Sequence, residues 1–150
     1  MREKTDNGPY HIYAEAEVTV EFYDCDPLKV VWHGNYFNYF EVGRRMLLEK
    51  IGYGYDAMEN SGYAFPVIEA SAKFLGSLRF RDRARVKAIL EEYENRIRIK
   101  YEIRNVQTGL LTTKGVSTQM AVDMRTNESC FVCPQVLIDK VEAVIRGETP

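Results

Sequence analysis

Apolar and polar residues alternate strictly near the start of the chain, over residues 11–22. The apolar face of this segment comprises Ile12, Ala14, Ala16, Val18, Val20 and Phe22. A period of two that persists over so many residues predicts a β-strand with one face in the core.

A helical spacing of apolar residues follows. The stripe consists of Tyr36, Tyr39, Phe40, Gly43, Met46, Leu47 and Ile51. Phe37, Val42 and Leu48 lie off this stripe, which predicts a helix that is buried on more than one side. A glycine on the stripe costs about 1 kcal/mol relative to alanine, so we expect another backbone to approach closely at Gly43. Asn35 is expected to cap the start of the helix with its side chain.

The rest of the chain is mainly strand-like. Residues 53–66 are expected to form a loose segment with a short helix, and residues 67–75 a strand. Alternation returns over 86–91 and 96–104, and a hairpin turn is expected at 105–109. A last strand is expected over 110–123, with Val116, Thr118, Met120 and Val122 on one face, and a short helix after Pro134.

This order of elements predicts an α+β fold with an antiparallel sheet of about five strands. A sheet of that size must curl around the single long helix to be covered by it, and such a wrap also explains the many-sided apolarity of the helix. We expect one domain over residues 1–150, with residues 1–9 as a loose N-terminal arm and a short C-terminal helix.

Composition and charge exclude several classes of protein. The chain carries 20 Lys and Arg and 22 Asp and Glu, a formal net charge of -2, so a nucleic-acid partner is not expected. No apolar run approaches the roughly 18–20 residues that cross a bilayer, so membrane insertion is not expected. The first residues, MREKTDNGPYH, contain no hydrophobic signal core. A cytoplasmic location is therefore expected.

Three cysteines are too few for a disulfide framework. Cys130 and Cys133 form one CxxC before Pro134, but no second Cys or His pair lies near enough in sequence to complete a zinc site. The βαβ context of a redox CxxC is also missing. We expect no metal here, and interpret the two residues as small side chains at a strand-to-helix junction.

The stretch YDCDPLKVVWHGNYF, residues 23–37, concentrates the candidate chemistry. No HExxH, GxSxG or phosphate-loop motif is present, and His11 is expected to be solvated. Pro27 restrains Asp26 away from the helical region, and Asp24 points to the same side if the backbone is extended. The helix start supplies unpaired N–H groups, so a carboxylate beside it provides both parts of an acyl-transfer site. The residues alone nevertheless favour turn or capping roles for both acids.

The longer segment YDCDPLKVVWHGNYFNYFE resembles the active-site segment of the 4-hydroxybenzoyl-CoA thioesterase family, which has the hotdog fold. The shared pattern is D-x-D, a small loop, V-V/I-x-H/Y, then N-Y and an acidic residue inside the helix. The matching residues are Asp24, Asp26, Val30, Val31, His33, Asn35, Tyr36 and Glu41. The order of elements over residues 12–140 matches too. The resemblance implies a hotdog fold, with the sheet wrapped around one central helix.

The resemblance also implies a role for each residue. Asp26 is expected to be the catalytic carboxylate, as nucleophile or general base, and the backbone N–H groups around His33 and Gly34 to polarise the thioester carbonyl. The His33 side chain is expected to orient substrate or water, and a partly buried structural histidine is the alternative. Glu41 is expected to be structural or interfacial. The supporting residues are expected to be Asp24, Asn35 and Tyr36.

An acyl-CoA thioesterase of this kind needs no cofactor and assembles as a homodimer or homotetramer with sites between protomers. The wall of the acyl pocket is expected to include Tyr55, Tyr63, Phe65 and Val67. Some relatives bind the CoA phosphates at a basic turn between two central strands. Here Glu94 and Asn95 occupy that turn and only Arg96 remains, so Lys73 or the arginines at positions 79, 81, 83 and 85 are alternative ligands.

Three alternatives stay open on the sequence. An acyl-carrier-protein thioester is a second possible substrate. A hotdog dehydratase or hydratase needs a base that removes a proton α to the carbonyl, but His33 is followed by Gly-Asn and not by the Phe-Pro of that branch. A non-catalytic acyl-thioester binder would bind acyl-CoA without turnover, so release of free thiol distinguishes it.

Overall fold

The computed structural model describes residues 6–148 and confirms the α+β class. The helices are α1 (Asn35–Ile51), α2 (Tyr55–Ser61) and α3 (Gln135–Ile145), and a 3-10 helix, η1, spans Phe22–Asp24. The long strands are β1 (Tyr13–Thr19), β3 (Val67–Phe74), β4 (Arg83–Glu92), β5 (Ile97–Asn105) and β6 (Leu111–Gln119). The short strands are β2 (Tyr63–Ala64), β7 (Val122–Asp123) and β8 (Glu128–Ser129).

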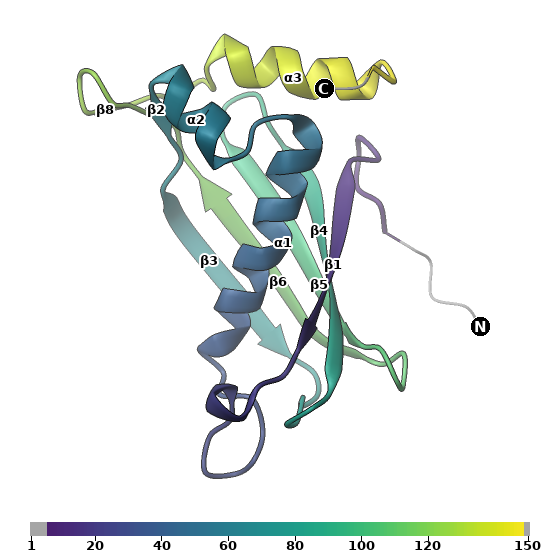
Figure 1. Cartoon of the computed structure of the whole chain (residues 1–150). Helices are drawn as coiled ribbons and strands as arrows, with labels where there is room; N and C mark the ends of the chain where they lie inside the picture. Colours follow the sequence, from purple (N-terminus) through teal and green to yellow (C-terminus); the bar gives the residue numbers. More distant parts are fainter. Residues whose placement is uncertain (1–5, 149–150) are drawn as a thin grey trace.

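The five long strands form one antiparallel sheet in the order β1-β4-β5-β6-β3, and the short strands form a second sheet, β2-β7-β8. Helix α1 lies across one face of the large sheet, as Figure 1 shows, which confirms the hotdog arrangement. Its first turn lies at the end of the molecule that carries η1 and the following loop. Helices α2 and α3 and the small sheet lie at the opposite end.

Two small residues allow α1 to lie close to the sheet. A Cβ at Gly43 would lie 2.9 Å from Val86 Cγ1 and 3.3 Å from the Ala88 Cβ. The sheet therefore does approach closely at Gly43, but through side chains and not through the backbone that we expected. Phe40 stacks on Tyr101, with 4.6 Å between ring centroids and 13° between planes. The edge of the Phe40 ring fills the space over Gly115 that a Cβ would need.

Strand β6 presents small and polar residues to α1. Tyr101 pairs with Gly115 under Phe40, and Tyr101 Oη lies 2.7 Å from Ser117 Oγ. Gln119 continues this face, because side chains two apart on a strand share a side, and its amide donates to Ser117 Oγ. Val116 and Thr118 share the other face, as the alternation predicted, and Thr118 is buried as well. Hydroxyl and amide groups fit the interior here because they bond one another.

Strand β1 is shorter than the alternation predicted. Ile12, Ala14 and Val20 are buried as expected, but the strand ends at Thr19. Phe22 then lies in η1 with 78% of its surface exposed, so its assignment to the core face is wrong. Val20 is still held beside the segment before β4, because Arg81 N–H donates to Val20 O and Val20 N–H donates to Asp82 O. After Val20 the chain turns into η1.

The expected N-terminal arm is only partly described, since residues 1–5 lie outside the described range. The part that follows rests on the sheet. Lys100 Nζ pairs with Asp6 at 2.5 Å, and Lys87 Nζ donates to Asn7 Oδ1 at 2.7 Å. Across residues 6–148 no helix combines the length and apolarity needed to span a bilayer.

Candidate active site

The loop between η1 and α1 is a small hairpin. Asp26 N–H donates to Val30 O at 2.9 Å, Trp32 N–H donates to Asp24 O at 3.0 Å, and Cys25 bridges Val31 between them. The hairpin is joined to the segment before β4, because Val31 N–H donates to Leu78 O at 2.8 Å and Val30 bridges Arg79. The backbone around both aspartates is thus fixed by hydrogen bonds on two sides.

Asp26 lies at the outer end of this hairpin and is half-buried. Its Oδ1 accepts the N–H of Leu28 at 2.8 Å, an arrangement that holds the carboxylate in one orientation. Within residues 6–148, Oδ2 accepts no hydrogen bond. One carboxylate oxygen is therefore held while the other is left for a ligand.

Asp24 is held at one carboxylate oxygen and at its carbonyl oxygen. Its Oδ2 accepts from Tyr39 Oη at 3.0 Å and from the Glu21 N–H at 2.9 Å. Its carbonyl oxygen accepts from Asn35 Nδ2 at 2.8 Å. We expected Asn35 to cap α1, and this is wrong. Its side chain instead ties the first residue of the helix to the hairpin. Burial, and then Asp24, raise the pKa of the Tyr39 phenol above its ordinary value.

The start of α1 leaves two backbone donors unused. Gly34 is the N-cap residue and no side chain caps the helix. The N–H groups of Asn35, Tyr36 and Phe37 donate to carbonyls three residues back. The N–H groups of His33 and Gly34 have no acceptor within residues 6–148. These are the two groups that the resemblance assigned to the thioester carbonyl.

Aromatic rings surround this helix start. The exposed His33 ring lies between Trp32 and Phe74, with centroid distances of 5.0 and 6.4 Å. His33 is exposed in the single chain, and its role in orienting substrate or water stays a prediction. Tyr36 is buried, and its Oη accepts the Leu78 N–H at 3.3 Å. A Cβ at Gly34 would overlap the ring of the exposed Trp32 side chain, so the ring would have to move.

The residues expected to bind substrate lie elsewhere in the same chain. Tyr63 and Val67 lie at the start of β2 and β3, at the end of the molecule opposite Asp26. Phe65 is buried against Tyr53, with 5.8 Å between ring centroids. Lys73 is exposed near the other end of β3. Within one chain the structure therefore does not bring the expected pocket wall to the carboxylate.

Arg96 and Tyr55 are engaged in other contacts. Arg96 Nε pairs with Glu92 at 3.2 Å beside the β4–β5 turn. Tyr55 Oη donates to Glu41 Oε2 at 3.3 Å, and the same oxygen accepts from Arg44 Nη2 at 2.8 Å. This cluster of Glu41, Arg44 and Tyr55 lies along α1 and at the start of α2, about two turns or more from the start of α1.

Sequence reasoning missed the contribution of Tyr39 and Phe74 to the site. Tyr39 falls on the apolar stripe of α1, so it was counted as core, and the ring is indeed buried. Only the hairpin geometry shows that its hydroxyl reaches Asp24. Phe74 was predicted only as part of a strand. Its contact with His33 joins residues far apart in sequence, so no local pattern indicates it.

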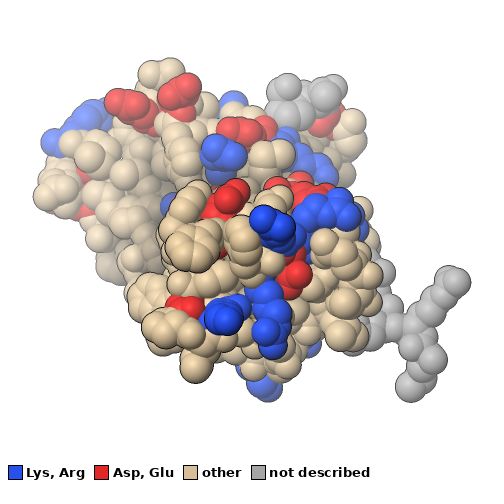
Figure 2. Space-filling model, turned by 60° about the horizontal axis from the view of Figure 1, so that its bottom comes forward, with Lys and Arg blue, Asp and Glu red and all other residues tan. Residues whose placement is uncertain are grey.

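Neither the charged surface at this end nor the two cysteines before α3, at the opposite end, add further chemistry to the site. Figure 2 brings this end of the molecule forward and shows Lys, Arg, Asp and Glu side chains interspersed among uncharged ones. Burial raises the pKa of the Cys133 thiol to about 12, and Cys130 is half-buried. Over the described range no group of three or more His, Cys, Asp or Glu side chains is placed to hold a metal ion.

Comparison with known proteins gives consistent matches. A Bacillus subtilis (strain 168) protein provisionally named as an acyl-CoA thioesterase is 30% identical over 111 residues, which cover 73% of this chain and 80% of that protein. A chloroplastic acyl-acyl carrier protein thioesterase of Arabidopsis thaliana, ATL3, is 40% identical over 76 residues, 51% of this chain and 40% of that protein. The structure of a DHNA-CoA thioesterase from Staphylococcus aureus superposes with a TM-score of 0.76 at 27% identity, covering 90% of this chain and 94% of the other.

The family model of the thioesterase-like superfamily matches residues 20–141, which include the hairpin, α1 and all of the large sheet except β1. The resemblance drawn from the Asp24 to Glu41 segment is confirmed at this level. The chain belongs to the thioesterase-like superfamily.

Proposed function

We propose that this thioester hydrolase acts on acyl-CoA, with Asp26 as its catalytic carboxylate. The observation that carries the proposal is that one hydrogen-bonded hairpin bears both Asp26, whose Oδ2 accepts no hydrogen bond within residues 6–148, and two N–H groups without an acceptor there, at His33 and Gly34. The relative from B. subtilis, named as an acyl-CoA thioesterase, supports CoA as the carrier.

The chemistry follows from the charges that develop in thioester hydrolysis. The carbonyl oxygen gains negative charge as its carbon is attacked, and backbone N–H groups at a helix start stabilise that charge. Asp26 acts in one of two ways. It attacks the carbonyl carbon and expels the CoA thiolate, leaving an anhydride that water hydrolyses, or it takes a proton from water that attacks the carbon and expels the thiolate. In both routes Asp24, held by Tyr39 and Asn35, keeps the hairpin aligned with the helix.

The complete site requires a second copy of the chain. Strand β3 is an edge of the sheet and exposes apolar residues, with Val67 42%, Ile68 54% and Phe74 46% exposed. Such an edge is suited to pair with another strand. Antiparallel pairing of β3 with itself about a two-fold axis places Val67 of the partner subunit opposite Phe74. Because Phe74 contacts His33, this homodimer brings Val67 of the partner subunit, one residue of the expected pocket wall, to the catalytic end.

Replacement of Asp26 by asparagine tests the assignment. Asp26→Asn keeps the size of the side chain and removes the negative charge, so hydrolysis of acyl-CoA is expected to fall about 10²- to 10⁴-fold. Glu15→Gln, which removes an exposed carboxylate on β1, is the matched control and is expected to retain full activity. Near-normal thiol release by a folded Asp26→Asn protein would rule the assignment out.

An acyl-carrier-protein thioester is the second candidate substrate, favoured by the match to ATL3. Presenting one acyl group on CoA and on a carrier protein, at equal concentrations, decides between them. A higher kcat/KM with CoA supports the first proposal, and a higher kcat/KM with the carrier protein supports the second.

A further inference from the structure

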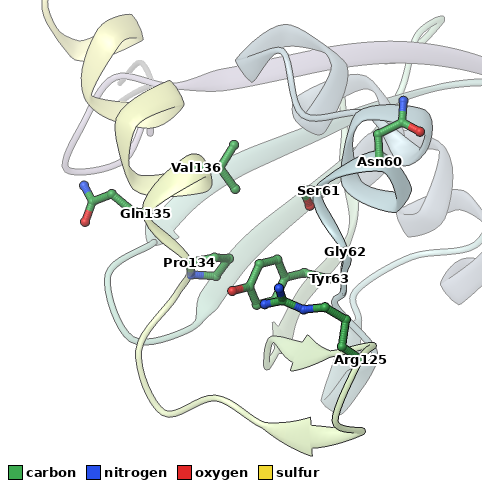
Figure 3. A pocket seen from close by; sticks show the side chains of 8 residues that line it. All are labelled: Asn60, Ser61, Gly62, Tyr63, Arg125, Pro134, Gln135 and Val136. Atoms are coloured by element: carbon green, nitrogen blue, oxygen red, sulfur yellow. The ribbon is translucent and has the colours of Figure 1, made fainter.

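A cavity of about 560 Å³ lies at the end of the molecule opposite the Asp26 hairpin. Figure 3 shows it between the end of α2, the β7–β8 turn and the start of α3. Asn60, Tyr63, Arg125 and Gln135 supply its polar and aromatic lining. Its size is within the usual range for a site that holds a small organic ligand.

The lining suits a ligand that combines a flat ring with phosphate groups. In Figure 3 the Tyr63 ring and the Arg125 guanidinium lie beside each other in the cavity. Asp123 accepts from Arg125 Nε and Nη2, both at 3.3 Å, and 76% of the Arg125 side chain is exposed, so a ligand can reach the guanidinium. Arginine matches phosphate geometry with its planar set of donors, and a tyrosine ring offers a face for stacking.

The start of α3 adds to the positive character of this wall. Pro134 is the N-cap residue, and no side chain caps the helix. The N–H groups of Gln135 and Val136 have no acceptor within residues 6–148. Neither of these groups alone makes a site, but they border the same cavity as Arg125.

The cavity is far from the catalytic carboxylate of its own chain. Strand β3 separates the two ends, and its eight residues span roughly 24 Å. The β3 pairing of the proposed dimer reverses this relation. It places Val67 of the partner subunit at Phe74, and the cavity of that subunit lies beyond Val67, on the side of the Asp26 hairpin.

We infer that this cavity binds the phosphorylated nucleotide end of the CoA whose thioester lies at Asp26 of the partner subunit. The inference rests on the proposed function and its dimer. It replaces the expectation that Arg96 binds the CoA phosphates, because Arg96 lies beside the β4–β5 turn and does not line this cavity.

Two thioesters of the same acyl group test the inference kinetically. One is the acyl-CoA and the other is the acyl-pantetheine, which lacks the nucleotide. For Arg125→Ala, kcat/KM is expected to fall about 10- to 100-fold with acyl-CoA and to stay unchanged with acyl-pantetheine. Arg146→Ala removes an exposed arginine that also pairs with a carboxylate two residues away, Glu148, and is expected to change neither. Equal effects of Arg125→Ala on both thioesters, or a CoA-specific loss in Arg96→Ala in its place, would overturn the inference.

Direct binding separates this inference from the proposed activity. Adenosine 3′,5′-bisphosphate titrated into the unaltered chain in a calorimeter is expected to bind, and binding is expected to be lost in Arg125→Ala but kept in Arg146→Ala. If neither thioester is hydrolysed, the proposed function fails while this measurement still reports on the cavity. Absence of binding, or binding that Arg125→Ala leaves intact, would overturn the inference.

Mixed dimers test whether the two ends cooperate across subunits. Asp26→Asn and Arg125→Ala chains are co-expressed with different tags, and unsorted dimers are assayed with acyl-CoA. If the site is shared, random assembly leaves about a quarter of all sites with both groups intact, and activity rises above that of either parent. If each site uses one chain only, no site is intact and activity stays at the mean of the parents, which would overturn the inference.

Discussion

The hydroxyl of Tyr39 offers the most direct test of how the hairpin is held. Tyr39→Phe removes one oxygen and keeps the buried ring, so the change is confined to the 3.0 Å hydrogen bond to Asp24 Oδ2. A hydrogen bond to a charged group contributes about 1.5–3 kcal/mol. Asp24 is partly exposed and water replaces part of the lost bond, so about 1–2 kcal/mol of stability should be lost, or about 2–8 °C in Tm.

The matched control is Tyr53→Phe. Tyr53 is also fully buried, but its Oη bonds a neutral partner, Ser61 Oγ, at 2.7 Å. It should lose about 0.5–1.5 kcal/mol of stability and leave kcat unchanged. Tyr39→Phe should lower kcat several-fold, because the freed Asp24 no longer holds the hairpin against α1. Equal kcat for Tyr39→Phe and the unaltered chain would refute a positioning role for Tyr39.

The pH dependence gives a second reading of the same contact. Burial and Asp24 raise the pKa of Tyr39 in the folded chain above the ordinary 10.0. The stabilisation linked to this shift is therefore complete below pH 10 and is lost as the pH rises above it, because the unfolded chain ionises first. Denaturant unfolding at pH 8 and at higher pH should show the stability difference between the unaltered chain and Tyr39→Phe shrinking. A difference that is constant with pH would contradict the assignment.

Two further substitutions test the helix start and the subunit contact. Gly34→Ala should displace the Trp32 ring, which a Cβ would overlap. The fluorescence emission of this single tryptophan should shift and kcat should fall. If emission and kcat are both unchanged, glycine is not needed at this position. Ile68→Lys places a charge on the exposed edge strand β3, and light scattering should show monomers with little activity but an unchanged circular dichroism spectrum. Ile145→Lys, at a comparably exposed isoleucine on α3, should leave the oligomer intact, and a dimeric Ile68→Lys protein would argue against the β3 contact.

Local patterns predicted the fold well where a single element determines burial. The alternation at Ile12 and Ala14 and the stripe of α1 depend on one period each, and both were confirmed. Strand β6 carries no apolar pattern on the face that packs against α1, because its residues there, Gly115 and Ser117, are small or polar. Their place in the core depends on Phe40 and Tyr101, which come from other elements.

The candidate site divides in the same way. The sequence pointed to Asp26 and to the N–H groups of His33 and Gly34 because these lie within one short segment with a recognisable motif. It also assigned Asn35 to a cap, and the structure shows a bond to Asp24 O that depends on how the hairpin folds back. The Arg125 cavity left no sequence signal, because its walls come from three elements between residues 60 and 136.

The contacts of Phe40 over Gly115 and of Gly43 against Val86 fix α1 both along its axis and around it. The N–H groups at His33 and Gly34 are roughly 10–15 Å from these contacts along the helix, so these contacts and the hydrogen-bonded hairpin together set their position relative to the sheet. Residues around α2 and α3 can consequently diverge, and with them the preferred thioester, without displacing the donors. Changes at Gly115 would instead affect hydrolysis of every thioester alike, so reactivity and selectivity evolve at separate places in this chain.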